Sequence, residues 1–290
     1  MFLACVFAAM LLFAGCGKPP APAVEVQFIS FTAEFYDAVD KWVAFRGKDS
    51  TNIAGFVYID PHEGFLFNYE TTFIITETGL KKHSGRLDSA SDLPKIRLGG
   101  NTANVAILSD KDIEQLGLPK IPDWLKQFKP ENEDESSYLV SVGYSYNHIG
   151  ASHKAIEPLQ KVYDKDPHFR KVEFELAYAY NATKNFDKAI EISNKAIAYD
   201  STDYLLYKEL GFSLIHQDKL EEAEKVYLKG IEVSKTKEMQ AEMAHNMAYS
   251  YFLVKNKPKF KEWAELTKKY AEEDSKFLRN IKYFEKNWDK

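Results

Sequence analysis

The sequence has few of the residues on which several classes of protein depend. Only 2 of its 290 residues are cysteines, which is too few for a disulfide framework or for a zinc site built on cysteine. The 7 histidines are scattered, and none lies in a His-Glu-x-x-His pattern. We therefore expect neither a bound metal nor a cofactor.

Positive charge is also scarce. The 38 Lys and Arg are outnumbered by 43 Asp and Glu, the net charge is −5, and no dense basic block occurs. Proteins that bind nucleic acid usually show a basic face, because neutralising phosphate dominates their affinity. The charge balance argues against a nucleic-acid partner. With 45% hydrophobic residues the chain can nevertheless build globular cores, and its length allows two domains.

The first 15 residues, MFLACVFAAMLLFAG, carry no charge. A membrane-spanning helix needs about 20 apolar residues, so this shorter run favours the apolar part of a secretory signal peptide. Its end, Phe-Ala-Gly-Cys at residues 13–16, resembles the bacterial lipoprotein box, where cleavage precedes a cysteine that receives lipid. The resemblance implies a signal peptide at residues 1–15 and lipid on Cys16 at the head of a Pro-rich linker, residues 16–23. The alternatives are a plain secretory signal or a short anchor. No Lys or Arg precedes the apolar run, as a signal peptide would normally have, which would fit a start codon further upstream.

From about residue 136 the chain repeats itself with a period of 34 residues, in segments 139–167, 174–201 and 208–235. Apolar residues at i, i+3, i+4 and i+7 predict two amphipathic helices in each segment. Small residues recur in register, where two helix axes can approach closely. Those of the first helix are Gly143, Ala177 and Gly211, and those of the second helix are Ala155, Ala189 and Ala223.

This register resembles that of the tetratricopeptide repeat family, in which stacked helix pairs bury one another's apolar faces. We expect a fourth, irregular pair up to residue 273 and a capping helix at residues 274–290. The expected fold is a small α+β domain at residues 24–128, a polar linker at 129–137 and an all-α superhelix of about four helix pairs at 138–273, followed by the cap.

In the tetratricopeptide repeat family the first helices line a concave surface that binds a protein or an extended peptide. Carried over position by position, the resemblance places an aromatic ladder and several polar side chains on that surface. The expected groove residues are Tyr144, Asn147, His148, Lys171, Glu175, Tyr178, Asn181, Lys208, Glu209, Phe212, His245 and Tyr249. The alternative is that part of the aromatic ladder packs between neighbouring helices, as aromatic residues at helical spacing usually do.

Some members of the family clamp a C-terminal carboxylate with Lys, Asn and Arg on these helix faces. The corresponding places in this sequence hold Val140, Tyr144, Glu175, Leu205 and Glu209. We therefore do not expect a carboxylate clamp of that kind.

Residues 24–128 show a different pattern. Helical spacing over residues 32–45 predicts a helix, and aromatic and β-branched runs at residues 55–60 and 64–69 predict a hairpin. The second run continues as strand to residue 76. Further short strands are expected at residues 96–98 and 104–108, and short helices at 109–116 and 123–128.

Potential acid–base groups are densest at Asp60, His62 and Glu63 in the hairpin turn. Asp is common in turns for conformational reasons, and the chain has no phosphate-binding loop and no nucleophile elbow. We therefore expect no enzymatic activity. A pocket that gathers these three residues with an Arg would favour the opposite interpretation.

The alternative function for residues 24–128 is an enzyme or a glycan-binding module that uses the repeats as a docking platform. Its sugar-stacking residues would be Phe56, Tyr58, Phe65 and Phe67. Burial of these rings in a filled β layer would argue against glycan binding.

The sequence as a whole predicts a membrane-anchored lipoprotein of a bacterial cell envelope that binds a protein or peptide partner as a scaffold or an assembly or secretion accessory. Gly17 after Cys16, rather than Asp, favours the outer membrane, with the protein facing the periplasm. Self-association through the concave face or the capping helix remains open.

Overall fold

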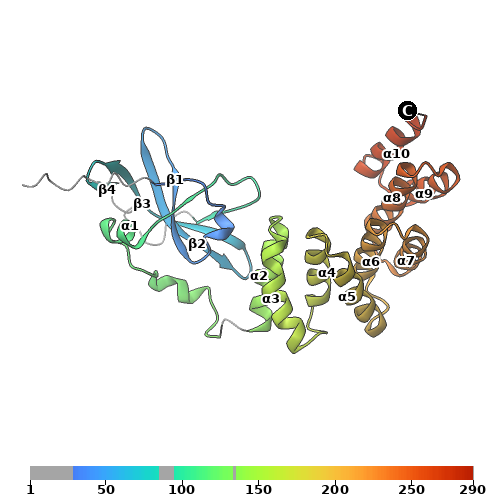
Figure 1. Ribbon diagram of the computed structural model, residues 1–290, viewed down its shortest axis with the longest axis horizontal. Coiled ribbons are helices and arrows are strands. Elements are labelled where there is room, and N and C mark those ends of the chain that lie inside the picture. The colour runs from blue at the N-terminus through green and yellow to red at the C-terminus, as the bar shows by residue number, and fades with distance from the viewer. Residues whose placement is uncertain (1–28, 85–94, 133–134, 290) are drawn as a thin grey trace, which may run out of the picture.

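The computed structural model describes residues 29–84, 95–132 and 135–289. A sheet-containing N-terminal region precedes a helical repeat region, and the stacked helices bend in an arc away from the sheet (Figure 1). The predicted signal peptide, Cys16 and the Pro-rich linker at residues 16–23 lie outside the described residues. Within the part of the chain that is described, no helix is both long and apolar enough to cross a membrane.

The N-terminal region is built on one antiparallel sheet. Its main path runs β4-β3-β2-β1-β6, and β5 pairs with β3. The strands are β1 (Lys41–Arg46), β2 (Thr51–Asp60), β3 (Gly64–Thr76), β4 (Gly79–Ser84), β5 (Lys95–Arg97) and β6 (Ala106–Ile107). The hairpin predicted at residues 55–60 and 64–69 is confirmed, since Tyr58 pairs with Leu66 and Asp60 with Gly64.

The helix predicted over residues 32–45 is wrong. Only a single 3-10 turn, η1 (Phe35–Asp37), forms there, and Asp40, which precedes strand β1, has a left-handed φ of 60° that a helix would not contain. Lys41–Arg46 is strand β1, paired with both β2 and β6. Because both faces of this strand are covered, Trp42 and Val43 are buried on opposite sides. A short apolar run of this kind cannot be distinguished from a helix by periodicity alone.

Each face of the sheet packs against different elements. One face meets α1 (Asp110–Gln115) and η2 (Asp123–Gln127) through Leu116 and Leu125. The predicted start of α1 is confirmed by a capping box, in which Asp112 accepts a hydrogen bond from the Ser109 backbone at 2.8 Å. The other face meets η1 and, from the helical region, the first repeat helix.

The helical region contains the helix pairs that the 34-residue register predicts. Its helices are α2 (Ser136–His148), α3 (Ser152–Lys165), α4 (Val172–Ala182), α5 (Phe186–Tyr199), α6 (Tyr204–His216), α7 (Leu220–Val233), α8 (Lys237–Leu253), α9 (Lys257–Tyr270) and α10 (Lys276–Lys286). The first helices of the pairs are α2, α4, α6 and α8. The last helix, α10, buries Phe277, Ile281 and Phe284 at the end of the stack.

The small residues of the register lie where the two helices of a pair cross. A Cβ atom on Gly143 would overlap the Leu159 side chain of α3, and one on Gly211 would overlap the Tyr227 ring of α7. Ala177 is fully buried at the corresponding place in α4. Close approach of the paired helices therefore explains the small residues, as predicted.

Candidate partner-binding groove

Three adjoining pockets lie along the first helices of the repeats. The α6 pocket has a volume of 260 Å³ and is lined by Tyr178, Asn181, Ala182, Lys208, Glu209, Phe212, Glu242 and Asn246. The α4 pocket has a volume of 240 Å³ and is lined by Tyr144, Asn147, His148, Phe174, Glu175 and Tyr178. Both are built from α2, α4, α6 and α8 alone.

The third pocket, which we name the hairpin pocket, has a volume of 490 Å³ and joins the sheet to the repeats. Its lining residues are Pro61, His62, Glu63, Gly64, Phe65, Arg97, Leu98, Gly99, Gly100, Tyr144, Ser145, His148 and Ile149. It exists because α2 packs on the sheet, with the Phe65 and Tyr146 rings edge to face at 5.2 Å.

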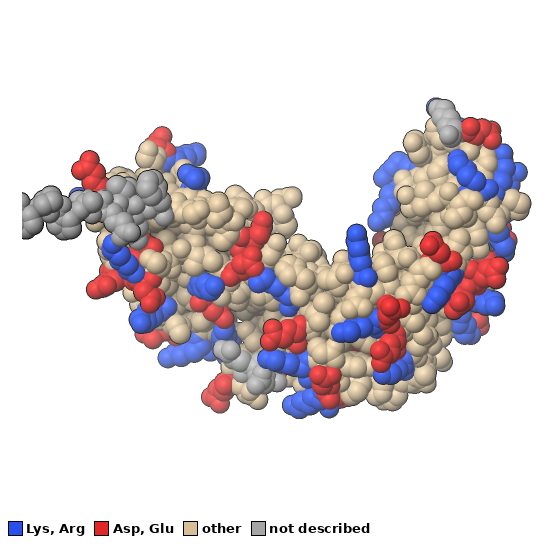
Figure 2. Space-filling view, viewed as in Figure 1, with Lys and Arg blue, Asp and Glu red and all other residues tan. Residues whose placement is uncertain are grey.

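The pockets share residues and form one continuous path, which we call the groove. Tyr144 and His148 line both the hairpin pocket and the α4 pocket, and Tyr178 lines both the α4 and the α6 pocket. In the space-filling view the molecule is hollowed between the N-terminal region and α8–α10, and the floor of the hollow is mostly uncharged (Figure 2).

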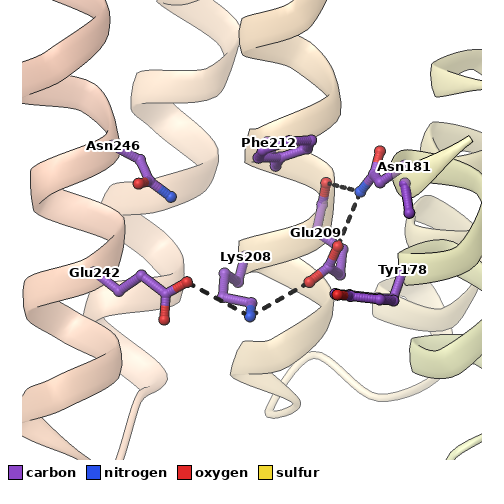
Figure 3. Close-up of a pocket in the computed structure, with 8 residues that line it drawn as sticks. Tyr178, Asn181, Lys208, Glu209, Phe212, Glu242 and Asn246 are labelled. Atoms are coloured by element: carbon purple, nitrogen blue, oxygen red, sulfur yellow. Dashed lines mark hydrogen bonds and ion pairs between the residues drawn. The ribbon is translucent and has the colours of Figure 1, made fainter. Parts of the chain in front are cut away.

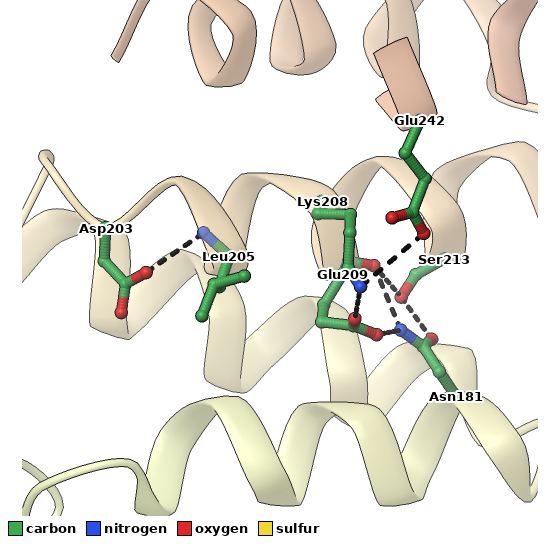
Figure 4. A network of polar contacts seen from close by, with 7 residues as sticks. All are labelled: Asn181, Asp203, Leu205, Lys208, Glu209, Ser213 and Glu242. Atoms are coloured by element: carbon green, nitrogen blue, oxygen red, sulfur yellow. Dashed lines mark hydrogen bonds and ion pairs between the residues drawn. The ribbon is translucent and has the colours of Figure 1, made fainter. Parts of the chain in front are cut away.

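Two Asn–Glu pairs form the floor of the groove. The Asn181 side-chain amide donates to Glu209 Oε2 at 2.9 Å and to the Glu209 carbonyl oxygen at 3.0 Å (Figure 4). One repeat earlier, Asn147 donates to Glu175 Oε2 and to its carbonyl oxygen, both at 2.9 Å. All four residues are buried, with 4% or 5% of their surface exposed. Each pair links the first helix of one repeat to the first helix of the following repeat.

Lys208 distinguishes the second pair from the first. Its ammonium group lies 3.4 Å from Glu209 Oε1 and 3.7 Å from Glu242 Oε1, so it bridges α6 and α8 (Figure 3). Burial lowers the pKa of Lys208, but the two carboxylates outweigh burial and raise this pKa above its ordinary value. Burial also raises the pKa of Glu209, although Lys208 opposes the shift.

Glu175 has no such counter-ion. The position equivalent to Lys208 is Phe174, and no ion pair joins Glu175 to any basic residue of the described ranges. Burial raises the pKa of Glu175, and neither the Asn147 hydrogen bond nor the charges of Lys171 and His148 offset that effect. A buried carboxylate without a counter-ion is energetically costly.

The aromatic ladder is divided between the groove and the helix contacts. Tyr144 is 50% exposed and Tyr178 is 38% exposed, so both rings offer surface to a ligand. Phe212 is half-buried beside the His216 ring at 4.3 Å. Tyr249 is exposed on one side and stacks on Phe284 of α10 at 5.4 Å.

Of the groove residues expected from the sequence, three lie outside the three pockets. Lys171 is exposed at the start of α4, and His245 and Tyr249 face α10, where the amide of Asn280 lies 3.2 Å from His245 Nε2. The remaining expected residues line the pockets. The sequence analysis missed Phe174 and Glu242, although the 34-residue register could have indicated Phe174 as the equivalent of Lys208.

The acid–base cluster of the hairpin turn is only partly assembled into a site. Asp60 Oδ1 accepts hydrogen bonds from the backbone of His62 at 2.8 Å and of Glu63 at 3.0 Å, so it shapes the turn. His62, Glu63 and Arg97 line the hairpin pocket, where Arg97 Nε donates to the Glu63 carbonyl oxygen at 2.7 Å. No group of three or more potential ligands among the described residues is arranged to hold a metal ion.

The proposed sugar-stacking rings are not on the surface. Phe56, Tyr58, Phe65 and Phe67 are at most 2% exposed, because the central strands are covered on both faces. The alternative prediction, that these four rings stack on sugars, is therefore wrong.

Comparison with known proteins concerns the helical region. Residues 174–203, which contain most of α4 and all of α5, match the tetratricopeptide repeat family model. The match supports the tetratricopeptide repeat family for this part of the chain. No curated protein sequence matches the chain.

Solved structures of tetratricopeptide repeat proteins resemble the helical region at low identity. A thermophilic protein from Thermus thermophilus is 14% identical over 53% of this chain and 83% of its own, with a TM-score of 0.46. MamA from Desulfovibrio magneticus RS-1 is 14% identical over 55% and 80%, with a TM-score of 0.40. A tetratricopeptide repeat protein from Parabacteroides merdae is 15% identical over 53% and 59%, with a TM-score of 0.42.

Proposed function

We propose that the protein is a membrane-tethered, non-catalytic scaffold that binds an extended segment of a protein partner along the groove. The observation that carries the proposal is the continuity of the three pockets through Tyr144, His148 and Tyr178. Half-exposed tyrosine rings bury a large area at a small cost in side-chain entropy, which suits recognition of a polypeptide.

The tether is the lipid expected on Cys16. Each buried CH₂ contributes about 0.8 kcal/mol to membrane binding, so two or three acyl chains would hold the protein firmly on a bilayer. Residues 17–23 contain three prolines and would form a stiff spacer between the lipid and the fold. This arrangement would present the groove beside a membrane of the bacterial envelope, with the outer membrane favoured, as an assembly or secretion accessory.

The test is site-specific photo-crosslinking in native membranes. A photoreactive amino acid at Tyr144 and another at Tyr178 should crosslink the same partner protein, because both positions line the groove. The matched control is Leu228, which is 48% exposed on α7, a second helix of its pair. Equal crosslinking from Leu228 would remove the groove as the binding surface.

A double substitution provides a second test. Tyr178→Ala with Phe212→Ala removes two rings of the α6 pocket and should abolish partner capture while circular dichroism shows an intact helical fold. Tyr283→Ala, on an exposed tyrosine of α10, should leave capture unchanged. Intact capture by the double variant would contradict the proposal.

The hairpin pocket supports a second candidate function, a small-ligand or catalytic site carried by the N-terminal region. His62, Glu63, Arg97 and His148 surround this pocket, while Asp60 does not line it. If this candidate holds, His62→Ala should change the chemistry or binding of a small molecule and leave crosslinking from Tyr178 intact. Loss of crosslinking in the same variant would assign the pocket to the partner groove.

A further inference from the structure

Two neighbouring repeats build the same buried carboxylate site and fill it differently. Glu175 and Glu209 are 34 residues apart, each is 4% exposed, and each accepts a hydrogen bond at 2.9 Å from an asparagine of the preceding first helix. In the third repeat the site holds the chain's own cation, because the Lys208 ammonium lies 3.4 Å from Glu209. The third repeat therefore shows that this carboxylate site accepts an ammonium group.

The second repeat has no cation at the equivalent position. Phe174 stands at the position of Lys208, and no basic side chain of the described ranges forms an ion pair with Glu175. Lys208 itself lies 5.8 Å from the centre of the Phe174 ring, at the border of the α4 pocket, but it is engaged by Glu209 and Glu242. The carboxylate of Glu175 therefore remains without a counter-ion.

Aromatic rings, together with Asn147 and His148, line the pocket that contains this carboxylate. Tyr144, Phe174 and Tyr178 line the α4 pocket together with Glu175. The faces of such rings attract cations, most strongly where water is excluded, and a carboxylate forms its strongest hydrogen bonds with ammonium or guanidinium groups. The chemistry of the pocket thus favours an organic cation over a neutral or acidic group.

We infer that the α4 pocket binds the side chain of a lysine or arginine belonging to the protein partner. This inference rests on the proposed function, because the pocket lies in the middle of the groove, between the hairpin pocket and the α6 pocket. Its volume of 240 Å³ accommodates one side chain, while the rest of the partner segment lies along the neighbouring pockets. The partner's cationic group is then the counter-ion of Glu175, as Lys208 is the counter-ion of Glu209.

The test is an NMR titration of the full chain with N-acetyl-lysine methylamide. Its neutral counterpart is N-acetyl-norleucine methylamide, which has the same backbone and a side chain without the ammonium group, at matched ionic strength. The lysine probe should shift the amide resonances of residues 174–178 saturably and bind at least fivefold more tightly than the norleucine probe. Equal binding of the two probes, or no saturable shift at these residues, would overturn the inference.

Three variants locate the binding at Glu175. Glu175→Gln keeps the acceptor for Asn147 and removes only the charge, so it should weaken the lysine probe at least fivefold. Glu242→Gln removes a charge from the neighbouring α6 pocket and should change the affinity less than twofold. Equal weakening by both variants would mean that general electrostatic attraction, and no specific site, binds the probe.

Phe174→Lys is the third variant and places in the second repeat the cation that the third repeat already has. It should abolish binding of the lysine probe because the site is then occupied from within. If crosslinking from Tyr144 and Tyr178 persists in the wild-type protein while the lysine probe fails to bind it, the inference is wrong and the proposed function stands. If the wild-type protein shows neither crosslinking from these positions nor binding of the lysine probe, the groove is not a binding surface.

Discussion

The side-chain amide of Asn147 lies 2.9 Å from Glu175 Oε2, and so ties α2 to α4 inside the repeat stack. Asn181 and Glu209 repeat this contact between α4 and α6. In the third repeat Ile215 stands at the asparagine position, and in the fourth pair, whose turn comes 3 residues later than the 34-residue register, Asn246 stands at the glutamate position, so the series ends there. Buried polar contacts of this kind are costly to break, because a buried group left unpaired loses its hydrogen bonds with water as well.

The two asparagines differ in one contact, which predicts a stabilising substitution. Asn181 Oδ1 accepts a hydrogen bond from Ser213 Oγ at 2.6 Å, whereas Asn147 Oδ1 is buried without a partner in the described structure. The residue equivalent to Ser213 is Ala179. Ala179→Ser should supply the missing donor and raise the free energy of unfolding by about 1 kcal/mol, as measured by urea denaturation.

Ser213→Ala is the matched control for that substitution. It leaves Asn181 Oδ1 unpaired and should lower the free energy of unfolding by about 1–2 kcal/mol. If Ala179→Ser is as destabilising as Ser213→Ala, the unpaired oxygen of Asn147 is not the cause of the difference between the two repeats.

The buried charge of Glu175 predicts a pH dependence of stability. Burial raises its pKa in the folded state, so between about pH 4.5 and the raised pKa the folded chain binds more protons than the unfolded chain. The contribution of Glu175 to stability therefore falls as the pH rises through that window. Relative to wild type, Glu175→Gln should gain about 1.4 kcal/mol for each unit by which the pKa is raised.

Urea denaturation of both proteins at several pH values checks this prediction. The difference should be small below about pH 4.5, grow as the pH rises, and level off once the folded carboxyl has ionised. A difference that stays constant from about pH 4 to about pH 8 would show that the pKa of Glu175 is not raised.

The helix crossing at Gly211 predicts a destabilising substitution. Alanine is better than glycine in a helix by about 1 kcal/mol, but its methyl group would overlap the fully buried Tyr227 ring. Overpacking against a rigid ring costs about 1–3 kcal/mol or more, so Gly211→Ala should reduce stability by about 1–2 kcal/mol. Thermal unfolding followed by circular dichroism measures the loss.

Gly143→Ala is the comparison, because its methyl group meets the flexible Leu159 side chain. It should cost less than Gly211→Ala, since a leucine can change rotamer more easily than a buried ring can move. A stabilising effect of Gly211→Ala would mean that the α6–α7 crossing has more space than the ring contact indicates.

The proposed membrane tether depends on one residue, Cys16. Cys16→Ser removes the thiol that would carry lipid, so the protein should move to the soluble fraction or keep its leader uncleaved. Fractionation of membranes and gel mobility measure both outcomes. Normal cleavage with full membrane retention of the variant would contradict lipid attachment at this residue.

The hairpin turn shows how far sequence reasoning reached in the N-terminal region. Aromatic and β-branched runs on both sides of a turn at Pro61 predicted the hairpin of β2 and β3, because a hairpin joins neighbouring segments and is specified locally. Strand β1 was missed, because its partners β2 and β6 decide its conformation. Trp42 illustrates the dependence on distant residues, since its ring nitrogen donates to the Pro119 carbonyl oxygen at 2.7 Å.

The sequence by itself determined the helix pairs and most residues of the groove, because each repeat contacts chiefly its neighbours and the 34-residue register carries that information along the chain. Only the tertiary structure decided that α2 packs on the sheet and extends the groove into the hairpin pocket, and that Glu209 has a counter-ion while Glu175 has none among the described residues. These features depend on contacts between side chains of separate helices and strands, and a period along the sequence does not encode such contacts.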